Sequence, residues 1–357
     1  MSGKQRIYWI DTLKFLGILA IYLFHLGEAG GRSYAFGFVY RVPLFFFISG
    51  CLASISTDQS SLPKFIYKQF KSLMIPYFFF AAIYIFLFVI MNNSGFSLAL
   101  QMARQDFLGV RNHISAPSLW FLPCLFLMEV LFRLLKTLLR NKWLILAVSV
   151  ALFFFVNHFL GFVPINDPRW FWNLDSALYY LIYFASGYFT FPYLVELLKL
   201  DTPAKRAGVA LAGVVAFALT GALYFQHDFI GAAFSRLGPL NTFSIVANAL
   251  SAIFCNILIA LVLQHWELLR RIGTNTLWLC GFEQSYKLVL SQLGTLLGIS
   301  ALGIQFANPL AAFLYALAIL LIAPFTVIPF GKKLYYSVFP GLAPAAKPTQ
   351  EQPARAV

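Results

Sequence analysis

The sequence predicts an all-α protein, a polytopic transmembrane helical bundle of about ten spans with both termini in the cytoplasm. Three observations support this: the composition, a series of long apolar segments and the placement of basic residues. Hydrophobic residues make up 60% of the 357 residues and charged residues only 11%, whereas soluble domains carry about 25% charged residues. With a mean hydropathy of +0.77, the chain has too little charge to cover a water-facing surface, so we expect an integral membrane protein.

The apolar segments have the length of membrane-crossing helices, which need about 20 mostly apolar residues. Ten segments qualify, at about residues 8–27, 37–56, 73–91, 118–136, 143–160, 174–191, 206–224, 242–263, 275–298 and 309–330. Turn and breaker residues separate them, including Gly30, Gly95, Pro164, Pro203 and Pro239. We expect one membrane-embedded domain over residues 1–335. The Ala- and Pro-rich stretch 336–357 is predicted to be a disordered cytoplasmic tail.

The basic residues predict the orientation. Of the 26 Lys and Arg residues, 18 fall in one set of alternate loops and six in the other, while Lys14 and Lys287 lie inside predicted spans. The positive-inside rule therefore puts both termini in the cytoplasm. The net charge of +13 is interpreted as a topology signal that also suits anionic lipid headgroups, not as a nucleic-acid-binding face.

No metal site or disulfide is expected. The four cysteines all fall inside apolar segments and form no CxxC pair, so the pattern supports neither a disulfide framework nor a zinc site. No cluster of His, Asp and Glu has the spacing of metal ligands.

The first predicted span carries three ionisable residues, Asp11, Lys14 and His25, and such residues are costly inside a membrane. Lys14 and His25 are eleven residues apart, which returns a helix to nearly the same face. We expect the two side chains to line one cavity about 16 Å apart along the helix axis, with Asp11 one turn below Lys14 and able to neutralise it. The alternative is structural: Asp11 and Lys14 as a snorkelling pair at the inner interface, and His25 as a cap at the outer end.

The span at 275–298 contains Glu283 and Lys287, whose spacing of four residues favours an ion pair on one helix face. This pair is predicted to lie mid-span, either in the functional site or as a structural pair between helices. Glu129 and Arg133 show the same spacing near the inner interface and are interpreted as structural. In the long outer loop 92–117, His113 accompanies Arg111 and suits contact with a polar acceptor, although a solvated loop histidine is the simpler alternative.

Four motifs carry a resemblance to a known family: RIYWIDTLKFLGILAIYLFH in the first span, RVPLFFFISG at 41–50, SLWFLPCLF at 118–126 and IGTNTLWLCGF at 272–282. On these motifs the chain resembles the acyltransferase-3 family of membrane acyltransferases, and most closely its fucose 4-O-acetylase-like branch. Lys14 and His25 fall on the family's first-span signature, in which a basic residue precedes a histidine by eleven positions. The family usually has Arg where this chain has Lys14, while relatives tend to have His at the places of Arg41 and Glu283.

The resemblance implies a bacterial inner-membrane enzyme that modifies surface polysaccharides. It would move an acyl group, most often acetyl from cytosolic acetyl-CoA, to a hydroxyl of an extracytoplasmic carbohydrate or lipid-linked saccharide. His25, Lys14 and Asp11 are then the candidate catalytic residues. Basic residues of the inner side are candidates for donor binding: Arg6, Lys64, Lys68 and Lys71. Arg41, His113 and Trp120 are candidates for acceptor binding.

Two points stay open at the level of sequence. The acceptor hydroxyl attacks the thioester directly with His25 as base, or His25 carries the acyl group transiently. The chain is also compatible with a polytopic transporter or proton-coupled carrier of an envelope component, in which Asp11, Lys14, Glu283 and Lys287 would relay charge. A third alternative is a non-catalytic assembly component of a polysaccharide system.

Overall fold

The computed structural model describes residues 6–26, 32–225, 235–298 and 309–343, and within these ranges every regular element is a helix. The helices of seven or more residues, apart from the 3-10 segment at 235–242, are α1 (Tyr8–Phe24), α2 (Arg32–Ser54), α3 (Leu62–Gln69), α4 (Ile75–Met91), α5 (Phe96–Leu108), α6 (Phe121–Leu139), α7 (Lys142–His158), α8 (Leu174–Leu197), α9 (Pro203–Phe225), α11 (Phe243–Leu263), α12 (Glu267–Gly273), α13 (Thr276–Leu297), α14 (Pro309–Ile322) and α15 (Val327–Val338). The predicted all-α helical bundle is confirmed.

Each of the ten predicted segments contains helix. By length and apolar composition, five helical stretches within the described ranges are able to cross a membrane, or six if the bent pair α14 and α15 forms one broken span. The others are shorter or more polar: α1 and α7 have 17 residues each, and α13 carries Glu283 and Lys287. The count of ten spans and the cytoplasmic placement of the termini therefore stay predictions.

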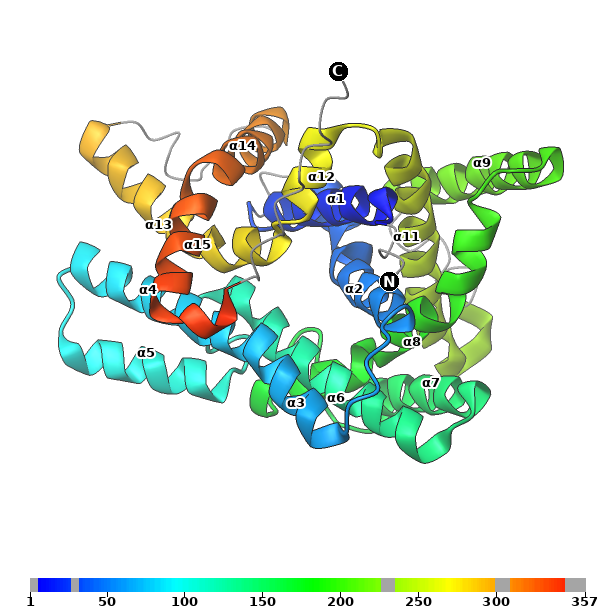
Figure 1. Ribbon diagram of the computed structural model, residues 1–357, viewed down its shortest axis with the longest axis horizontal. Coiled ribbons are helices and arrows are strands. Elements are labelled where there is room, and N and C mark those ends of the chain that lie inside the picture. The colour runs from blue at the N-terminus through cyan, green and yellow to red at the C-terminus, as the bar shows by residue number, and fades with distance from the viewer. Residues whose placement is uncertain (1–5, 27–31, 226–234, 299–308, 344–357) are drawn as a thin grey trace, which may run out of the picture.

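The helices depart from the predicted segments in two places. The outer loop 92–117 contains the helix α5, which packs beside α4 (Figure 1). The last predicted span breaks into α14 and α15, which meet at 47°, because Pro324 lacks a backbone N–H and Thr326 has a non-helical backbone (φ −116°, ψ −91°). Helix α15 continues to Val338, past the expected boundary at residue 335. Residues 344–357 of the expected tail lie outside the described residues.

Helix α1 lies in the interior of the bundle, where it packs against α2, α11, α12, α13 and α14 (Figure 1). Ten of its 17 residues are buried. This position explains how a helix that carries Asp11 and Lys14 can be held in an apolar protein, since protein surrounds it on several sides. Residues on different faces of α1 consequently meet different helices.

Helices α2 and α8 pack closely through two glycines, each of which faces the backbone of the other helix. A Cβ atom on Gly50 would lie 2.0 Å from the carbonyl oxygen of Phe184, and one on Gly187 would lie 2.1 Å from that of Phe47. Neither position has room for a side chain, so glycine is required at both for the helices to approach this closely. The last residue of the motif at 41–50 therefore fixes the position of one wall of the candidate site.

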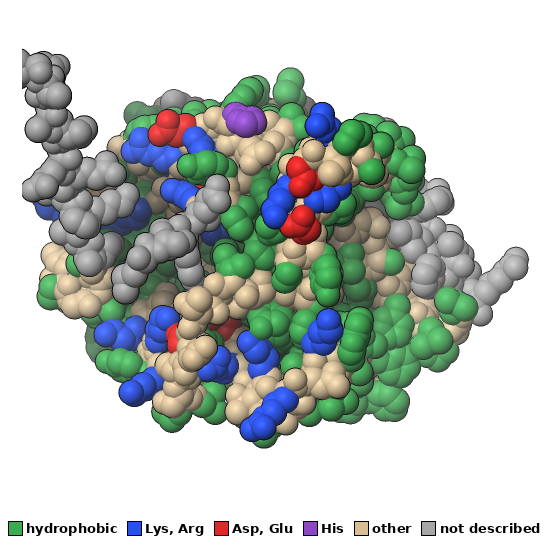
Figure 2. Space-filling view, turned by 45° about the vertical axis from the view of Figure 1, so that its right-hand side comes forward, with side chains coloured by type: hydrophobic (Ala, Val, Ile, Leu, Met, Phe, Trp, Pro, Cys, Tyr) green, Lys and Arg blue, Asp and Glu red, His purple; other side chains and the backbone are tan. Residues whose placement is uncertain are grey.

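The outward faces of the bundle are apolar. Large exposed side chains occur on α4, α9, α11 and α14, among them Phe86, Ile90, Leu211, Phe217, Val262 and Leu310. Figure 2 shows apolar side chains over broad areas of the visible face, with Lys and Arg gathered in groups, one of them along its lower part. An apolar exterior combined with a partly polar interior is expected of a protein whose solvent is lipid.

Candidate active site

A cavity of about 950 Å³ runs through the bundle between α1, α2, α6, α8 and α13. This volume is at the upper end of the range of about 300–1,000 Å³ common for ligand pockets. Seven of the lining residues come from one face of α6 and follow helical spacing: Phe121, Leu122, Leu125, Glu129, Phe132, Arg133 and Lys136. Trp120, another lining residue, directly precedes α6, and Lys136 is the last lining residue on it. Their separation of 16 positions corresponds to about 24 Å along the helix axis at 1.5 Å per residue.

Lys14 and His25 both line this cavity, as do Ile18 and Ile21 between them. The predicted sharing of one cavity by these two residues thus agrees with their positions on α1. Asp11 does not line it. Its Oδ2 atom lies 2.7 Å from Nε of Arg6, and the Asp11 carbonyl oxygen packs against Gly273 of α12. Among the described residues, Asp11 forms its ion pair with Arg6, where the spacing predicted one with Lys14.

His25 stands at the C-terminal end of α1 and contacts a buried carboxylate of α13. Its Nδ1 atom lies 2.6 Å from Oε1 of Glu283, and Nζ of Lys287 lies 2.8 Å from the same oxygen. Nζ of Lys287 also donates to the carbonyl oxygen of His25 at 3.4 Å. The Glu283 side chain is fully buried, so its charge is balanced by Lys287 and by the imidazole N–H rather than by water.

This contact determines which ring nitrogen of His25 is available for chemistry. An ionised carboxylate only accepts hydrogen bonds, so Nδ1 carries the hydrogen and Nε2 of the neutral ring keeps its lone pair. Nε2 makes no hydrogen bond within the part of the chain that the structure describes. An imidazole that is held through Nδ1 and open at Nε2 is arranged to take a proton or to act as a nucleophile.

One end of the cavity carries two arginines against aromatic rings. The guanidinium carbon of Arg41 lies 3.1 Å from the centre of the Phe24 ring, and that of Arg111 lies 4.7 Å from the centre of Trp120. Arg41, Arg111 and Trp120 all line the cavity. His113, the third candidate for acceptor binding, is exposed in the loop and is not among the lining residues.

Asn173 holds this end of the cavity together. Its side chain accepts a hydrogen bond from the Arg111 amide at 2.9 Å and donates to the carbonyl oxygen of Gly109 at 2.6 Å. Nη2 of Arg111 in turn donates to the carbonyl oxygens of Pro164 and Ile165, both at 2.6 Å. Asn173 has a left-handed backbone (φ 57°), which asparagine tolerates better than most residues. Sequence patterns did not reveal this residue because its partners are about 60 positions away.

The other end of the cavity is basic and includes the connection between α2 and α3. Arg133 donates to the carbonyl oxygens of Asp58 and Ser60 at 3.2 and 2.7 Å, while Nζ of Lys136 donates to the Tyr188 hydroxyl at 2.6 Å. Nζ of Lys68 lies 2.7 Å from Oδ2 of Asp58. The Lys68 ammonium and hydrogen bonds from Ser60 hold the pKa of the Asp58 carboxyl well below its usual range.

The four candidates for donor binding lie outside the cavity lining. Arg6, Lys64 and Lys68 are exposed and Lys71 is partly exposed, with Lys68 at the rim through its contact with Asp58. The cations that do line this end are Arg133, for which the sequence predicts a structural role, and Lys136. The helical spacing of α6 residues was the available signal for finding them.

No metal-binding group occurs in the described ranges, since no three His, Cys, Asp or Glu side chains gather closely enough to hold an ion.

Comparison with known families gives one match, to a model named Acyl_transf_3 and described as an acyltransferase domain, over residues 7–328. This range includes every residue that lines the cavity. No curated protein and no solved structure matches the chain.

Proposed function

This chain belongs to the Acyl_transf_3 family of acyltransferase domains, and from that premise we propose that it moves an acetyl group from cytosolic acetyl-CoA to a hydroxyl of an extracytoplasmic or lipid-linked saccharide. The family and the five or six apolar helices make it a multi-pass membrane acyltransferase. The acetyl-CoA donor, the saccharide acceptor and the bacterial inner membrane as its location belong to the proposal.

The observation that supports the proposal best is that Lys14, His25 and two oppositely placed groups of cations line one elongated cavity. CoA is strongly anionic, and the end of the cavity with Arg133 and Lys136 offers cations for its phosphates. In the predicted orientation this end faces the cytosol. The acceptor would enter from the end with Arg41, Arg111 and Trp120, close to the His25 end of α1.

In the direct route, Nε2 of His25 takes the proton from the acceptor hydroxyl while the hydroxyl oxygen attacks the thioester carbonyl carbon. The C–O bond forms, the C–S bond breaks, and the proton passes from His25 to the CoA sulfur, which leaves as the thiol. Glu283 holds Nδ1 and stabilises the imidazolium that forms during the transfer.

In the alternative route, Nε2 attacks the thioester carbonyl carbon, the C–S bond breaks and CoA leaves as the thiolate. The saccharide hydroxyl then attacks the acetyl-imidazole, the C–N bond breaks to restore His25, and the hydroxyl proton is balanced by protonation of the thiolate to the CoA thiol. The contact between His25 and Glu283 is compatible with both routes. Trapping an acetyl group on purified protein in the absence of acceptor separates them.

The test of the function is a donor assay in proteoliposomes that follows loss of acetyl-CoA with and without extracted polysaccharide. We expect acetyl-CoA to be consumed and acetyl ester to appear only when the saccharide is present. Accumulation of saccharide across the membrane without ester formation would instead indicate a transporter. If neither occurred with acetyl-CoA or a larger acyl-CoA, the proposal would be wrong.

A further inference from the structure

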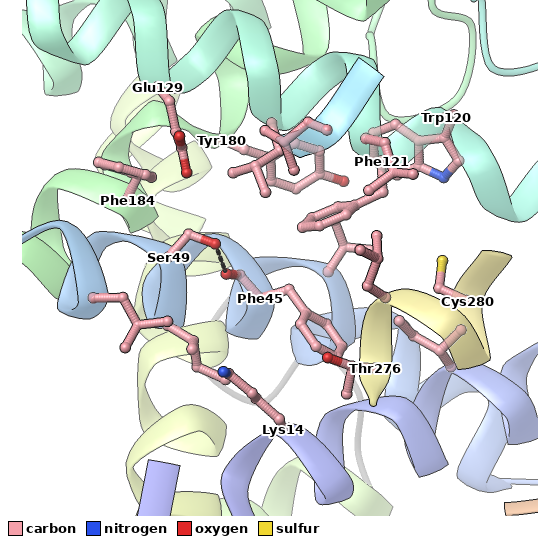
Figure 3. Close-up of a pocket in the computed structure, with 18 of the residues that line it drawn as sticks. Lys14, Phe45, Ser49, Trp120, Phe121, Glu129, Tyr180, Phe184, Thr276 and Cys280 are labelled. Carbon is pink, nitrogen blue, oxygen red and sulfur yellow. Dashed lines mark hydrogen bonds between the residues drawn. The ribbon is translucent and has the colours of Figure 1, made fainter. Parts of the chain in front are cut away.

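Glu129 stands in the middle of the cavity wall, on the face of α6 that lines it. Glu129 lies nine residues after Trp120 and seven before Lys136. At a rise of 1.5 Å per residue, it is about 13 Å from Trp120 and about 10 Å from Lys136 along the helix axis. Figure 3 shows its carboxylate directed away from α6 toward the space beside Ser49 and Phe184. A carboxylate at this level of an apolar bundle needs a partner.

One oxygen of the Glu129 carboxylate has no such partner in the described part of the protein. Oε2 of Glu129 is buried and has no hydrogen-bond partner among the described residues. The sequence spacing predicted an ion pair with Arg133, but the guanidinium of Arg133 donates to the carbonyl oxygens of Asp58 and Ser60. Lys136, the next cation on this face, donates to Tyr188. A buried carboxylate oxygen without a donor is costly, and a ligand that carries an N–H or O–H group at this level of the cavity would relieve that cost.

Two further polar groups line the cavity from other helices. Lys14 of α1 makes no hydrogen bond or ion pair to the described residues in the structure, so its ammonium is available to a ligand. The Ser49 hydroxyl of α2 donates to the carbonyl oxygen of Phe45 at 2.9 Å (Figure 3) and keeps its lone pairs as acceptors. Together the three side chains offer a donor and two acceptors to one ligand segment.

We propose that Lys14, Ser49 and Glu129 form a subsite for the amide-bearing pantetheine arm of the acyl-CoA donor. The inference rests on the proposed function. With the phosphates near Arg133 and Lys136 and the thioester at His25, the pantetheine arm crosses the level of Glu129. Its secondary amides carry N–H groups that the Glu129 carboxylate accepts and carbonyl oxygens to which Nζ of Lys14 donates. Glu129 is thus a specificity residue for the donor.

The test measures binding of three ligands to the full-length protein in detergent: CoA, pantetheine, and the nucleotide half of CoA, adenosine 3′-phosphate 5′-diphosphate. The variants are Glu129→Leu and Glu129→Gln, with Glu196→Leu as the control, because Glu196 is an exposed carboxylate whose ion pairs among the described residues are with Lys199 and Lys205. Calorimetric titration gives the Kd, and thermal unfolding without ligand gives the stability of each variant.

We expect Glu129→Leu to weaken CoA and pantetheine by about tenfold or more, as is usual for loss of a hydrogen bond to a charged group. Binding of the nucleotide half should not change. Glu129→Gln, which keeps an acceptor oxygen, should lose less than Glu129→Leu. Without ligand, Glu129→Leu should be at least as stable as the wild type, because it removes an unpaired buried carboxylate.

The inference is overturned if Glu129→Leu leaves CoA binding unchanged, or if it weakens the nucleotide half as much as CoA. Failure of the wild type to bind CoA or pantetheine overturns it as well. If the wild type binds CoA and Glu129→Leu weakens that binding, but no acetyl transfer to saccharide is found, the subsite stands and the proposed function fails. The two failures are therefore distinguishable.

Discussion

Nδ1 of His25 and Oε1 of Glu283 lie 2.6 Å apart, although 258 residues separate them in the chain. The contact joins the C-terminal end of α1 to the buried face of α13, and Lys287 completes it by an ion pair with the same carboxylate oxygen. The cluster fixes the imidazole in one tautomer and in one position at the cavity wall. It thereby supplies the geometry on which the first two predictions depend.

His25→Ala should lower acetyl transfer by roughly 10²–10⁴-fold, the usual contribution of a general base. Membrane insertion and binding of CoA should persist, because the donor is expected to be held mainly at the opposite end. Initial rates in proteoliposomes check this. His265→Ala is the matched control, since His265 is exposed beside α12 and away from the cavity lining. Transfer by His25→Ala above a tenth of the wild-type rate would exclude His25 as base or acyl carrier.

Glu283→Gln should lower kcat by about a hundredfold while the KM for acetyl-CoA stays nearly constant. The amide can present N–H to Nδ1 and so stabilise the wrong tautomer, as happens when the orienting carboxylate of a catalytic triad becomes an amide. A merely structural role would change thermal stability and leave the rate of the folded fraction intact. Steady-state kinetics on variant protein that passes gel filtration as the wild type does would distinguish the two roles.

Lys287→Met should destabilise the folded protein by about 3 kcal/mol or more, because it leaves the Glu283 charge with only the imidazole to balance it. The double variant Glu283→Gln/Lys287→Met should recover much of that loss, since both members of the ion pair are then neutral. Thermal unfolding in detergent measures both. Additive losses in the double variant would show that the two side chains do not stabilise the fold as a pair.

Part of this site could be predicted from the sequence because it depends on local helix geometry. Lys14 and His25 are eleven positions apart, which places them on one face of α1, and Glu283 and Lys287 are four positions apart, which brings these side chains together. The contact between His25 and Glu283 depends on how α1 and α13 pack, and no local pattern records that. Glu129 and Arg133 show the limit of spacing alone: the arginine is long enough to reach the carbonyl oxygens of Asp58 and Ser60 instead.

The same distinction holds for the fold. Hydropathy located the helical segments because lipid demands long apolar runs, but it left out α5, which is too polar and too short to register as a span. The bend between α14 and α15 lies within a continuous apolar run, so hydropathy merged the two helices. The close approach of α2 and α8 depends on Gly50 and Gly187 facing one another, and these residues come from separate helices.

Gly187→Ala should lower the thermal stability of the protein, because the new Cβ would lie 2.1 Å from the Phe47 carbonyl oxygen and α8 would have to move away from α2. Overpacking of this kind costs about 1–3 kcal/mol or more. Gly208→Ala is the matched control, since a Cβ there meets nothing within 4 Å. Equal stability of the two variants would contradict the close packing of α2 on α8.

Lys14→Ala should weaken CoA binding by about tenfold or more, whereas Lys14→Arg should keep most of it. Arginine preserves the cation that faces the cavity and adds a bidentate donor for phosphate or carbonyl oxygens. Titration with CoA and transfer rates at saturating donor separate an effect on binding from one on catalysis. If Lys14→Gln bound CoA as the wild type does, Lys14 would have no part in holding the donor.

The two ends of the cavity should separate by function, with donor binding at one and acceptor use at the other. Lys136→Met should weaken CoA binding, because Lys136 lines the basic end where the CoA phosphates are placed. Arg41→Ala should leave CoA binding nearly intact and lower transfer to saccharide.

The double variant Lys64→Ala/Lys68→Ala should weaken CoA binding less than Lys136→Met does. Both lysines are exposed and outside the lining, and exposed charges are screened by salt. CoA titrations and transfer rates on all three variants provide the comparison. Loss of CoA binding in Arg41→Ala together with its retention in Lys136→Met would reverse the direction of the site, and the donor would then enter from the end that carries Trp120.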